Sequence, residues 1–325
     1  MPATDFQPQL ATLVRTPPEG REWLHEIKLD GYRIGCRIRG SRVTLLSRNG
    51  KDWTHAFPAV ARAASELGVD DAVLDGEVVI LLPDGRTSFQ ALQNAFAGEG
   101  ASGSIVYFVF DLLRLNGERI DSLPLEERKA RLRTLIDAGA QGRIRYTDHV
   151  IGRGREFFEQ ARRMGLEGII SKRRDLPYRP GRHGGWLKAK CTQRQEFVIG
   201  GFTEPEGMRA GLGALLIGVY ENDRLVFSGK AGTGFTQRSA IELRRQLDRL
   251  EQRACPFSTP PAGRLGRDAH WVTPDLVCDV TFTEWTSDGK IRHPSFQGLR
   301  ADKRPRDVVR ERATSSKRKG QNPDA

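Results

Sequence analysis

The sequence has no long apolar run, no basic patch followed by an apolar run at its start, and few cysteines. Each absence bears on the class of protein to expect. Mean hydropathy is -0.50 over the 325 residues, so a membrane-spanning helix is excluded. The first residues, MPATD, contain no basic patch followed by an apolar run, so we expect a cytoplasmic protein without a secretory signal. The four cysteines are too far apart for a C-x-x-C pair, which argues against a zinc ribbon and a disulfide framework. They are Cys36, Cys191, Cys255 and Cys278.

Two common nucleotide-binding motifs are also missing. The segment GEGASG (98–103) fits G-x-G-x-x-G, but it follows a predicted helix and precedes a predicted strand, the reverse of the dinucleotide-binding order. No G-x-x-x-x-G-K-[ST] sequence occurs, because the segment SGK (228–230) is followed by Ala231 and lacks the upstream glycine. A nucleotide, if bound, is therefore not held by a P-loop.

Positive charge is the dominant feature of the composition. Lys and Arg number 52 against 41 Asp and Glu, which gives a net charge of +11 and a pI near 9.8. This excess makes nucleic acid the favoured partner. Charge alone leaves equally open the alternative that the basic side chains merely form solvated faces.

Length and periodicity indicate two domains and an α+β fold. A chain of 325 residues exceeds the usual size of one hydrophobic core. In the first part, strands are predicted at 22–30, 32–39, 42–47, 73–82, 105–113, 168–172 and 186–190, the first three forming a β-meander. The strand 105–113 is almost wholly apolar, as expected of a strand covered on both faces. Predicted helices lie at 59–67, 87–96, 124–136 and 154–164, the second capped by Thr87 with Gln90 at the capping-box position.

After residue 190 the pattern changes to strands broken by glycines. Strands are predicted at 196–203, 214–220, 224–230 and 276–285, with one helix that carries Ala240, Leu243, Leu247 and Leu250 on one face. Strands with a single helix in so short a segment favour a small closed barrel of the OB type. We therefore predict a first domain at 1–193, an OB-fold β-barrel domain at 194–311 and a disordered basic tail at 312–325.

The segment HEIKLDGYR (25–33) places Lys28 among charged side chains at the end of a predicted strand. Alternation puts Glu26, Lys28 and Asp30 on one face, opposite Ile27. A free lysine is almost wholly protonated at pH 7, so a nucleophilic Lys28 needs nearby cations or a metal that lower its pKa. Taken alone, the segment also fits a surface salt bridge among Glu26, Lys28 and Asp30.

KLDGYR (28–33) resembles the nucleophile motif of covalent nucleotidyltransferases, the superfamily of ATP-dependent DNA ligases, RNA ligases and mRNA capping enzymes. Six further segments resemble the other motifs of the superfamily, in its order. They are SRNG (47–50), LDGEVV (74–79), YFVFDLL (107–113), EGIISK (167–172), WLKAK (186–190) and LRADK (299–303). The sequences of the segments HEIKLDGYR and EWTSDGKIRHPSFQGLRADK are most similar to the ligase module of bacterial DNA ligase D.

The resemblance covers nearly the whole chain and implies both a fold and an activity. The implied fold is an adenylation (nucleotidyltransferase) domain of antiparallel sheets with flanking helices, followed by an OB-fold β-barrel domain. The implied enzyme is an ATP-dependent DNA ligase that seals nicks or broken ends in duplex DNA, in repair by non-homologous end joining. We expect a monomer at the bacterial nucleoid, working with an end-binding protein and with polymerase and phosphoesterase modules that this chain lacks.

The resemblance also implies a role for each matching residue. Lys28 would attack the α-phosphate of ATP, form lysyl-AMP and release pyrophosphate. A DNA-adenylate would follow, with Arg33 at the 5′-phosphate of the broken strand. The candidate cofactor-binding residues are Glu26, Arg33, Arg48 and Glu77 (the last two at the ribose), Phe110 (stacked on adenine), Lys188 and Lys190 (at the α-phosphate), and Arg300, Asp302 and Lys303 (orienting pyrophosphate). Glu77 and Glu167 are the candidate ligands for Mg²⁺ or Mn²⁺.

Several of these residues also have ordinary structural explanations. Phe110 lies in an apolar strand and fits a core position, and a glutamate before glycine, such as Glu167, fits a turn. Lys188 and Lys190 fit a basic edge strand. The segment 300–303 fits a solvated C-terminal turn.

Four rival functions remain for the whole chain. An mRNA capping enzyme would use the same lysine with GTP, and an RNA ligase would carry a different C-terminal domain. An NAD-dependent ligase would normally carry a four-cysteine zinc site, which this sequence lacks. A non-catalytic DNA-binding module would not be expected to keep Lys28, Glu77 and Glu167 together.

Overall fold

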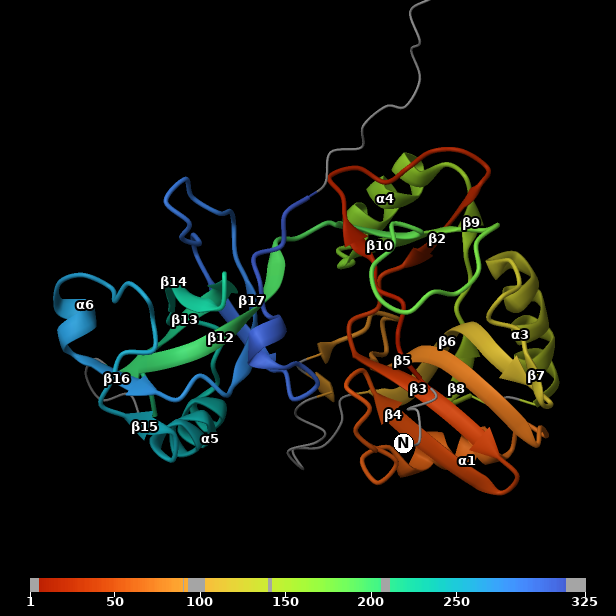
Figure 1. Cartoon of the computed structure of the whole chain (residues 1–325), viewed down its shortest axis with the longest axis horizontal. Coiled ribbons are helices and arrows are strands. Elements are labelled where there is room, and N and C mark those ends of the chain that lie inside the picture. Colours follow the sequence, from red (N-terminus) through yellow and green to blue (C-terminus); the bar gives the residue numbers. More distant parts are fainter. Residues whose placement is uncertain (1–5, 90, 93–102, 140–141, 206–210, 314–325) are drawn as a thin grey trace, which may run out of the picture. The chain divides into compact units, whose positions relative to one another are not determined.

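The computed structural model describes residues 6–89, 91–92, 103–139, 142–205 and 211–313, which form two compact units (Figure 1). Of these residues, the first unit contains 6–88, 103–139, 142–191 and 312–313, and the second contains the rest. The chain passes from one unit to the other between Cys191 and Thr192, two residues before the predicted domain boundary. Most of the helix predicted at 87–96 and of the tail predicted at 312–325 lies outside the described residues.

One sheet of the first unit has the strand order β1-β11-β10-β2-β9 and is antiparallel except where β1 pairs with β11. Its strands are β1 (Thr12–Leu13), β2 (Trp23–Ile27), β9 (Val150–Ile151), β10 (Gly168–Arg173) and β11 (Trp186–Lys190). Helix α4 (Gly154–Arg163) packs against β2 and β10 (Figure 1). Apolar side chains fill this contact, including Ala161, Ile169 and Ala189.

The other sheet of the first unit has the order β4-β3-β5-β6-β7, with β8 added to β6 as a parallel strand. Its strands are β3 (Tyr32–Arg39), β4 (Arg42–Ser47), β5 (Asp71–Leu81), β6 (Ser104–Leu115), β7 (Glu118–Arg119) and β8 (Ile144–Tyr146). Helix α1 (Pro58–Ser65) packs on β3 and β4, and α3 (Leu125–Gly139) packs on β6 and β8. The long strands β5 and β6 are almost entirely buried, as their apolar sequences require.

The β-meander predicted for the start of the chain is wrong. Strands β3 and β4 do form an antiparallel hairpin. Strand β2, however, pairs with β9 and β10 in a different sheet, so the residues between Ile27 and Tyr32 connect two sheets rather than two neighbouring strands. Adjacency in the sequence suggested the hairpin, whereas the hydrogen bonds of β2 go to segments far along the chain.

The second unit is built on one antiparallel sheet around β12, which pairs with β13, β16 and β17. Its strands are β12 (Arg194–Thr203), β13 (Ala214–Glu221), β14 (Arg224–Ala231), β15 (Glu251–Gln252), β16 (Ala269–Val272), β17 (Val277–Thr281) and β18 (Ser295–Leu299). Its helices are α5 (Gln237–Asp248), α6 (Arg264–Arg267) and a 3-10 turn (Pro305–Asp307). The predicted strand 276–285 ends at Thr281, and β18 was not predicted.

One hydrophobic core holds the second unit together. It contains Phe197, Phe202, Leu216 and Leu247, all fully buried, so α5 packs its apolar face onto the sheet. Thr236 begins α5 with a capping box in which its hydroxyl accepts the Ser239 amide. Across the residues that the structure describes, no helix is both long enough and apolar enough to span a membrane.

Candidate active site

Three adjacent strands, β2, β10 and β11, bring several predicted nucleotide-binding residues onto one face of their sheet. Residues paired directly across an antiparallel ladder point to the same face, and alternate residues along a strand share it. The rows on this face are Leu24–Lys172–Trp186, Glu26–Ile170–Lys188 and Gly168–Lys190. Lys28 continues past the end of β2 beside the last row, where its amide donates to the Gly168 carbonyl over 2.9 Å.

The opposite face of the same strands is packed against α4. Ile27 and Ile169 lie in that apolar contact, and His25 Nδ1 lies 2.8 Å from Ser171 Oγ. The predicted alternation, with Glu26 and Ile27 on opposite faces, is therefore confirmed. Both faces are covered, however, so Glu26 is buried rather than on a surface.

Lys28 forms an ion pair with Glu167, whose Oε1 lies 2.6 Å from the lysine Nζ. Burial alone would lower the pKa of Lys28, but the carboxylates of Glu167, Glu77 and Asp30 outweigh it and raise that pKa above its usual value. The sequence argument expected cations to lower this pKa. The carboxylates around Lys28 instead favour its protonated form.

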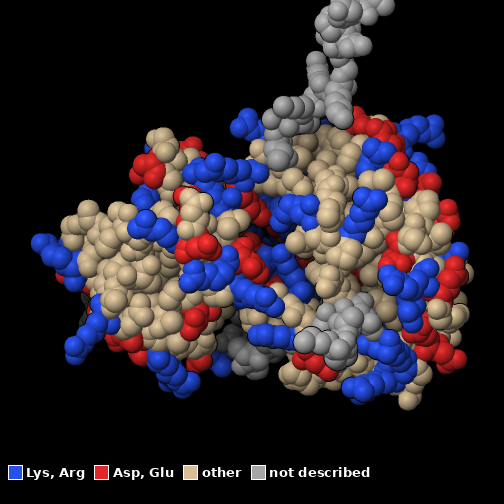
Figure 2. All heavy atoms as spheres, viewed as in Figure 1, with Lys and Arg blue, Asp and Glu red and all other residues tan. Residues whose placement is uncertain are grey.

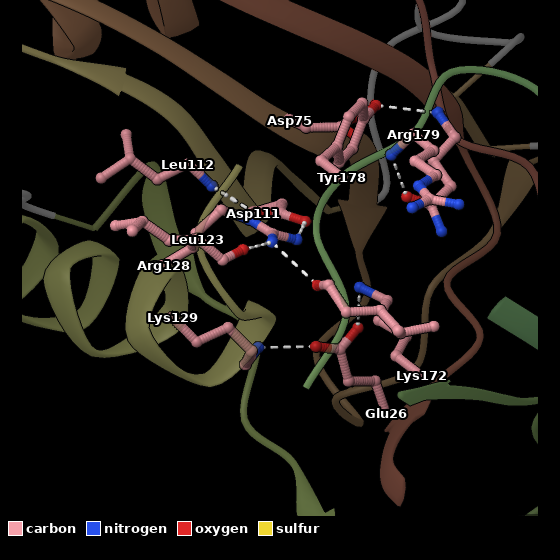
Figure 3. Close-up of polar contacts among 12 residues, drawn as sticks. Glu26, Asp75, Asp111, Leu112, Leu123, Arg128, Lys129, Lys172, Tyr178 and Arg179 are labelled. Atoms are coloured by element: carbon pink, nitrogen blue, oxygen red, sulfur yellow. Dashed lines mark hydrogen bonds and ion pairs between the residues drawn. The ribbon is translucent and has the colours of Figure 1, made fainter. Parts of the chain in front are cut away.

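Glu26 is held by two lysines that the sequence argument did not assign (Figure 3). Lys129 Nζ of α3 lies 2.6 Å from Oε1, and Lys172 Nζ of β10 lies 2.6 Å from Oε2. Burial alone would raise the pKa of Glu26, but the two ammonium groups lower it below its usual value. The sequence alone also fitted a salt bridge between Glu26 and Lys28. In the structure, Glu26 instead pairs with Lys129 and Lys172, and Lys28 pairs with Glu167.

The buried position of Lys172 affects its own protonation. Burial lowers its pKa to about 8, against the attraction of Glu26. Its Nζ also lies 4.1 Å from the ring centroids of both Phe110 and Trp186. Lys172 belongs to the quoted segment EGIISK, which was the only sequence signal for it.

Arg33 is fixed by a buried carboxylate. Its Nε and Nη2 donate to the two oxygens of Asp75 over 2.5 and 2.6 Å, and the Tyr178 hydroxyl donates to Asp75 Oδ2 over 2.8 Å. The guanidinium carbon lies 4.5 Å from the Phe110 ring centroid. The arginine predicted to meet a DNA phosphate is therefore oriented in advance, and its side chain keeps 19% of its surface exposed.

Phe110 is 6% exposed and packs edge-to-face on Trp186, with ring centroids 5.9 Å apart. Arg33 and Lys172 lie over the ring as well, so a stacked adenine would use the part of the ring that these cations leave open. Phe110 is therefore a core residue, as its apolar strand suggested. Its contact with adenine stays a prediction.

Of two further predicted residues, Glu77 contacts the loop that carries Lys28, and Arg48 is placed by its strand. Glu77 of β5 accepts the Gly31 amide through Oε1 over 2.9 Å, and Arg48 directly follows β4. Glu77 and Glu167 both act on the charge of Lys28, so the site offers two carboxylates near one lysine. Carboxylates together with phosphate oxygens and water suit Mg²⁺ or Mn²⁺, so this donor set fits the predicted cation.

The three predicted residues of segment 299–303 lie in the second unit. Arg300 donates to both oxygens of Asp302 over 2.9 and 2.8 Å, and Lys303 Nζ lies 2.8 Å from Glu196 Oε1. Arg300 also lies 4.5 Å above the Phe89 ring. Because Asp302 is 1% exposed, the alternative of a solvated turn is wrong for this segment.

Basic side chains are spread over the surface of both units. Figure 2 shows Lys and Arg interspersed with Asp and Glu on the face that it displays. This distribution suits contact with a polyanion at many points. It does not by itself define a DNA path.

Comparison with known proteins identifies the family of both parts of the chain. Residues 5–190 match the model described as "ATP dependent DNA ligase domain", and residues 208–303 match the "ATP dependent DNA ligase C terminal region". The chain is 44% identical over 308 residues to the multifunctional non-homologous end joining protein LigD of Pseudomonas aeruginosa, covering 94% of this chain and 36% of that protein. The LigD of Mycobacterium tuberculosis strain H37Rv is 37% identical over 292 residues, covering 89% of this chain and 38% of that protein. The chain thus spans less than two fifths of these relatives.

Solved structures agree with this assignment. Mycobacterial DNA ligase D complexed with ATP is 35% identical, with a TM-score of 0.71 over 96% of this chain and 100% of that chain. The ligase domain of M. tuberculosis LigD has the same identity and coverage, with a TM-score of 0.54. The predicted α+β fold, with a nucleotidyltransferase domain and an OB-type domain, is confirmed, as is the predicted class of enzyme. The chain belongs to the ATP-dependent DNA ligase family.

Proposed function

We propose that this chain seals nicks or broken ends in duplex DNA through a lysyl-AMP formed on Lys28 and a DNA-adenylate. The observation that carries this proposal is the ion pair of Lys28 with Glu167 at the end of β2, beside Glu77. A lysine with a carboxylate 2.6 Å from its Nζ has a proton acceptor in place. The names of the LigD relatives support a role in non-homologous end joining.

In the first step, Lys28 transfers a proton from its ammonium group to Glu167 Oε1, and the free amine attacks the α-phosphorus of ATP. The bond between the α-phosphorus and the oxygen that bridges it to the β-phosphorus breaks, and pyrophosphate leaves. The amine loses its second proton to solvent as the phosphoramidate forms. Lys188 and Lys190, from the adjacent rows of β11, supply positive charge to the phosphate. Glu77 and Glu167 would hold a divalent cation, which would neutralise further phosphate charge.

In the later steps, AMP passes from Lys28 to the 5′-phosphate of the broken strand, and a 3′-hydroxyl then displaces AMP. Arg33 is the candidate for holding the 5′-phosphate, since Asp75 fixes its guanidinium and leaves part of the side chain exposed. Arg300, Asp302 and Lys303 are the candidates for orienting pyrophosphate. The proposed partners are duplex DNA, an end-binding protein and the other modules of LigD proteins, at the bacterial nucleoid.

The test is intact-protein mass after incubation with ATP and Mg²⁺, with GTP and NAD in parallel. The sample is first treated with pyrophosphate, which removes any AMP already attached. We expect one AMP to be gained from ATP alone by the wild type, and none by Lys28→Ala or by Lys28→Arg, which keeps the charge without the nucleophile.

Nick sealing of a labelled duplex follows as the second measurement. A gain of GMP from GTP would favour the capping-enzyme alternative. No covalent gain from any nucleotide would refute the proposed chemistry. Adenylylation without sealing would restrict the proposal to the first step.

A further inference from the structure

We infer that Tyr178 and Gln9 are positioning residues that hold the guanidinium of Arg33 for the 5′-phosphate of a broken DNA strand. Both are buried, and they act on Arg33 rather than on the DNA. The inference deepens the proposed function and rests on it, because it concerns the arginine that is the candidate for holding that phosphate.

A closed ring of hydrogen bonds joins four residues from separate segments of the first unit. Arg33 of β3 donates to both oxygens of Asp75 of β5. Tyr178, between β10 and β11, donates its hydroxyl to Asp75 Oδ2 over 2.8 Å, and the same hydroxyl accepts the Gln9 amide over 2.8 Å. The Gln9 carbonyl closes the ring by accepting from Arg33 Nη2 over 3.3 Å. Each group of the ring therefore restricts the orientation of the next.

The ring is almost closed to solvent. Asp75 is 0% exposed, Gln9 3% and Tyr178 7%. Burial raises the pKa of Tyr178 well above its usual value, so its hydroxyl keeps its proton and donates it. The donation to Asp75 is charge-assisted and shorter than the alternative one to the Gln7 carbonyl, at 3.4 Å. Without this hydroxyl, Asp75 would lose a donor and the buried Gln9 amide would lose its acceptor.

The ring determines which edge of Arg33 can meet a ligand. It engages Nε and Nη2, and within the described part of the chain no hydrogen bond to Nη1 is found. The guanidinium carbon lies 4.5 Å from the Phe110 ring centroid and 5.2 Å from that of Trp186, so aromatic rings cover its face. Nη1 is thus the group left to meet a phosphate oxygen. Because such a contact depends on direction, a small rotation of the guanidinium would weaken it.

A second set of contacts fixes the loop that carries Tyr178. Figure 3 shows Arg179 next to Tyr178 on this loop, and the Arg179 amide donates to Gln9 Oε1 over 2.8 Å. Two backbone hydrogen bonds of 2.7 and 3.1 Å also join residues 8–10 to Gly181. Gln9 therefore contacts Arg33 through its carbonyl and the loop through its side chain, so the two are held together.

The experiment measures how tightly the adenylylated protein binds a nicked duplex with a 5′-phosphate and the same duplex with a 5′-hydroxyl. Binding is followed by fluorescence anisotropy in EDTA, which withholds the divalent cation and stops the chemistry. We expect the wild type to bind the phosphorylated nick about 10-fold or more tightly. This ratio of affinities should fall several-fold in Tyr178→Phe. It should fall less in Gln9→Ala, which removes only the side-chain contact with the loop.

Arg33→Ala shows whether the effect of Tyr178 passes through Arg33. This substitution should abolish most of the ratio, and adding Tyr178→Phe to it should change the ratio no further. A substitution that merely loosens the fold would lower the affinity for both duplexes alike, so the ratio separates positioning from stability.

Tyr107→Phe is the matched control. The Tyr107 hydroxyl is also buried, but it donates to the Ile34 carbonyl over 2.8 Å rather than to a carboxylate. Tyr107→Phe should lower stability in urea unfolding, as Tyr178→Phe does, and should leave the ratio of affinities unchanged.

Three results would overturn the inference. The first is an unchanged ratio in both Tyr178→Phe and Gln9→Ala, and the second is a fall of the same size with and without Arg33. The third is an unchanged ratio in Arg33→Ala, which would also refute the assignment of the 5′-phosphate to Arg33. A wild type that forms no lysyl-AMP refutes the proposed function in the mass assay, before any duplex is added, so the two failures are distinguishable.

Discussion

Arg128→Met tests whether the buried ion pair of Arg128 and Asp111 stabilises the first unit. Arg128 of α3 and Asp111 of β6 are both 0% exposed and are joined by two hydrogen bonds of 2.7 and 2.8 Å. Arg128 Nη1 also donates to the carbonyls of Leu123 and Leu176. The same helix carries the next residue, Lys129, towards Glu26. The pair therefore fixes the helix that carries Lys129.

The magnitude follows from what the substitution leaves behind. Methionine fills much of the arginine volume, but Asp111 becomes a buried carboxylate without its countercharge, at a cost of about 3–5 kcal/mol. The two carbonyls lose a charged donor as well, so we expect a total near the upper end of that range. Asp111→Asn removes the buried charge and keeps an acceptor for the Leu112 amide. The double variant should recover about 2 kcal/mol or more relative to the sum of the single variants.

The assay is urea unfolding of the wild type, the two single variants and the double variant at one pH. The double-mutant cycle gives the interaction energy of the pair, provided that the slopes of unfolding against urea agree. A loss below about 1 kcal/mol in Arg128→Met would refute the reasoning. The reasoning would also be refuted if the double variant lost as much free energy of unfolding as the two single variants together.

Three further predictions follow from the structure. Burial lowers the pKa of His149 to about 4, so His149 takes up a proton in the unfolded chain at a higher pH than in the folded protein. As the pH falls from 7 to about 5, the free energy of unfolding of the wild type should therefore decrease by about 1–2 kcal/mol more than that of His149→Gln, measured by urea unfolding. A Cβ at Gly31 would collide with a backbone carbonyl of β5, so Gly31→Ala should slow adenylylation of Lys28 by about 100-fold in the mass assay. Gly232→Ala is the control and should not slow it, because a Cβ at Gly232 would make only ordinary van der Waals contacts. Tyr178→Phe removes the hydroxyl that donates to Asp75 and should cost about 1–2 kcal/mol in thermal unfolding, and a neutral effect would contradict this.

Local pattern was enough to find many strands of the fold. The predicted strands 32–39, 42–47 and 186–190 match β3, β4 and β11, because alternation and turn residues are local properties. Strand pairing is not local, which explains the error over β2. The short strand β18 was missed because its SFQGL sequence carries little apolar signal, and its pairing with β17 supplies the rest.

The site shows the same division between local and distant information. Alternation placed Glu26 on the correct face, but the partners of Glu26 come from α3 and β10. Lys129 lies in the strongly charged segment EERKARLR, where a lysine resembles a solvent-exposed one, yet it is 2% exposed. The direction of the Lys28 pKa was also beyond the sequence, because Glu167 is brought to it by the pairing of β10 with β2.

Two carboxylates of the site, Glu26 and Glu167, have different relations to their lysines. Glu26 is paired with two lysines, and neither of them is the nucleophile. Glu167 is the ion-pair partner of Lys28 itself, and this contact must change before Lys28 can attack phosphorus. The charge of Glu26 is therefore stabilised by lysines other than the nucleophile, whereas the carboxylate of Glu167 favours the protonated form of the nucleophile itself. A substitution of Glu167 should therefore change how fast Lys28 reacts with any nucleotide.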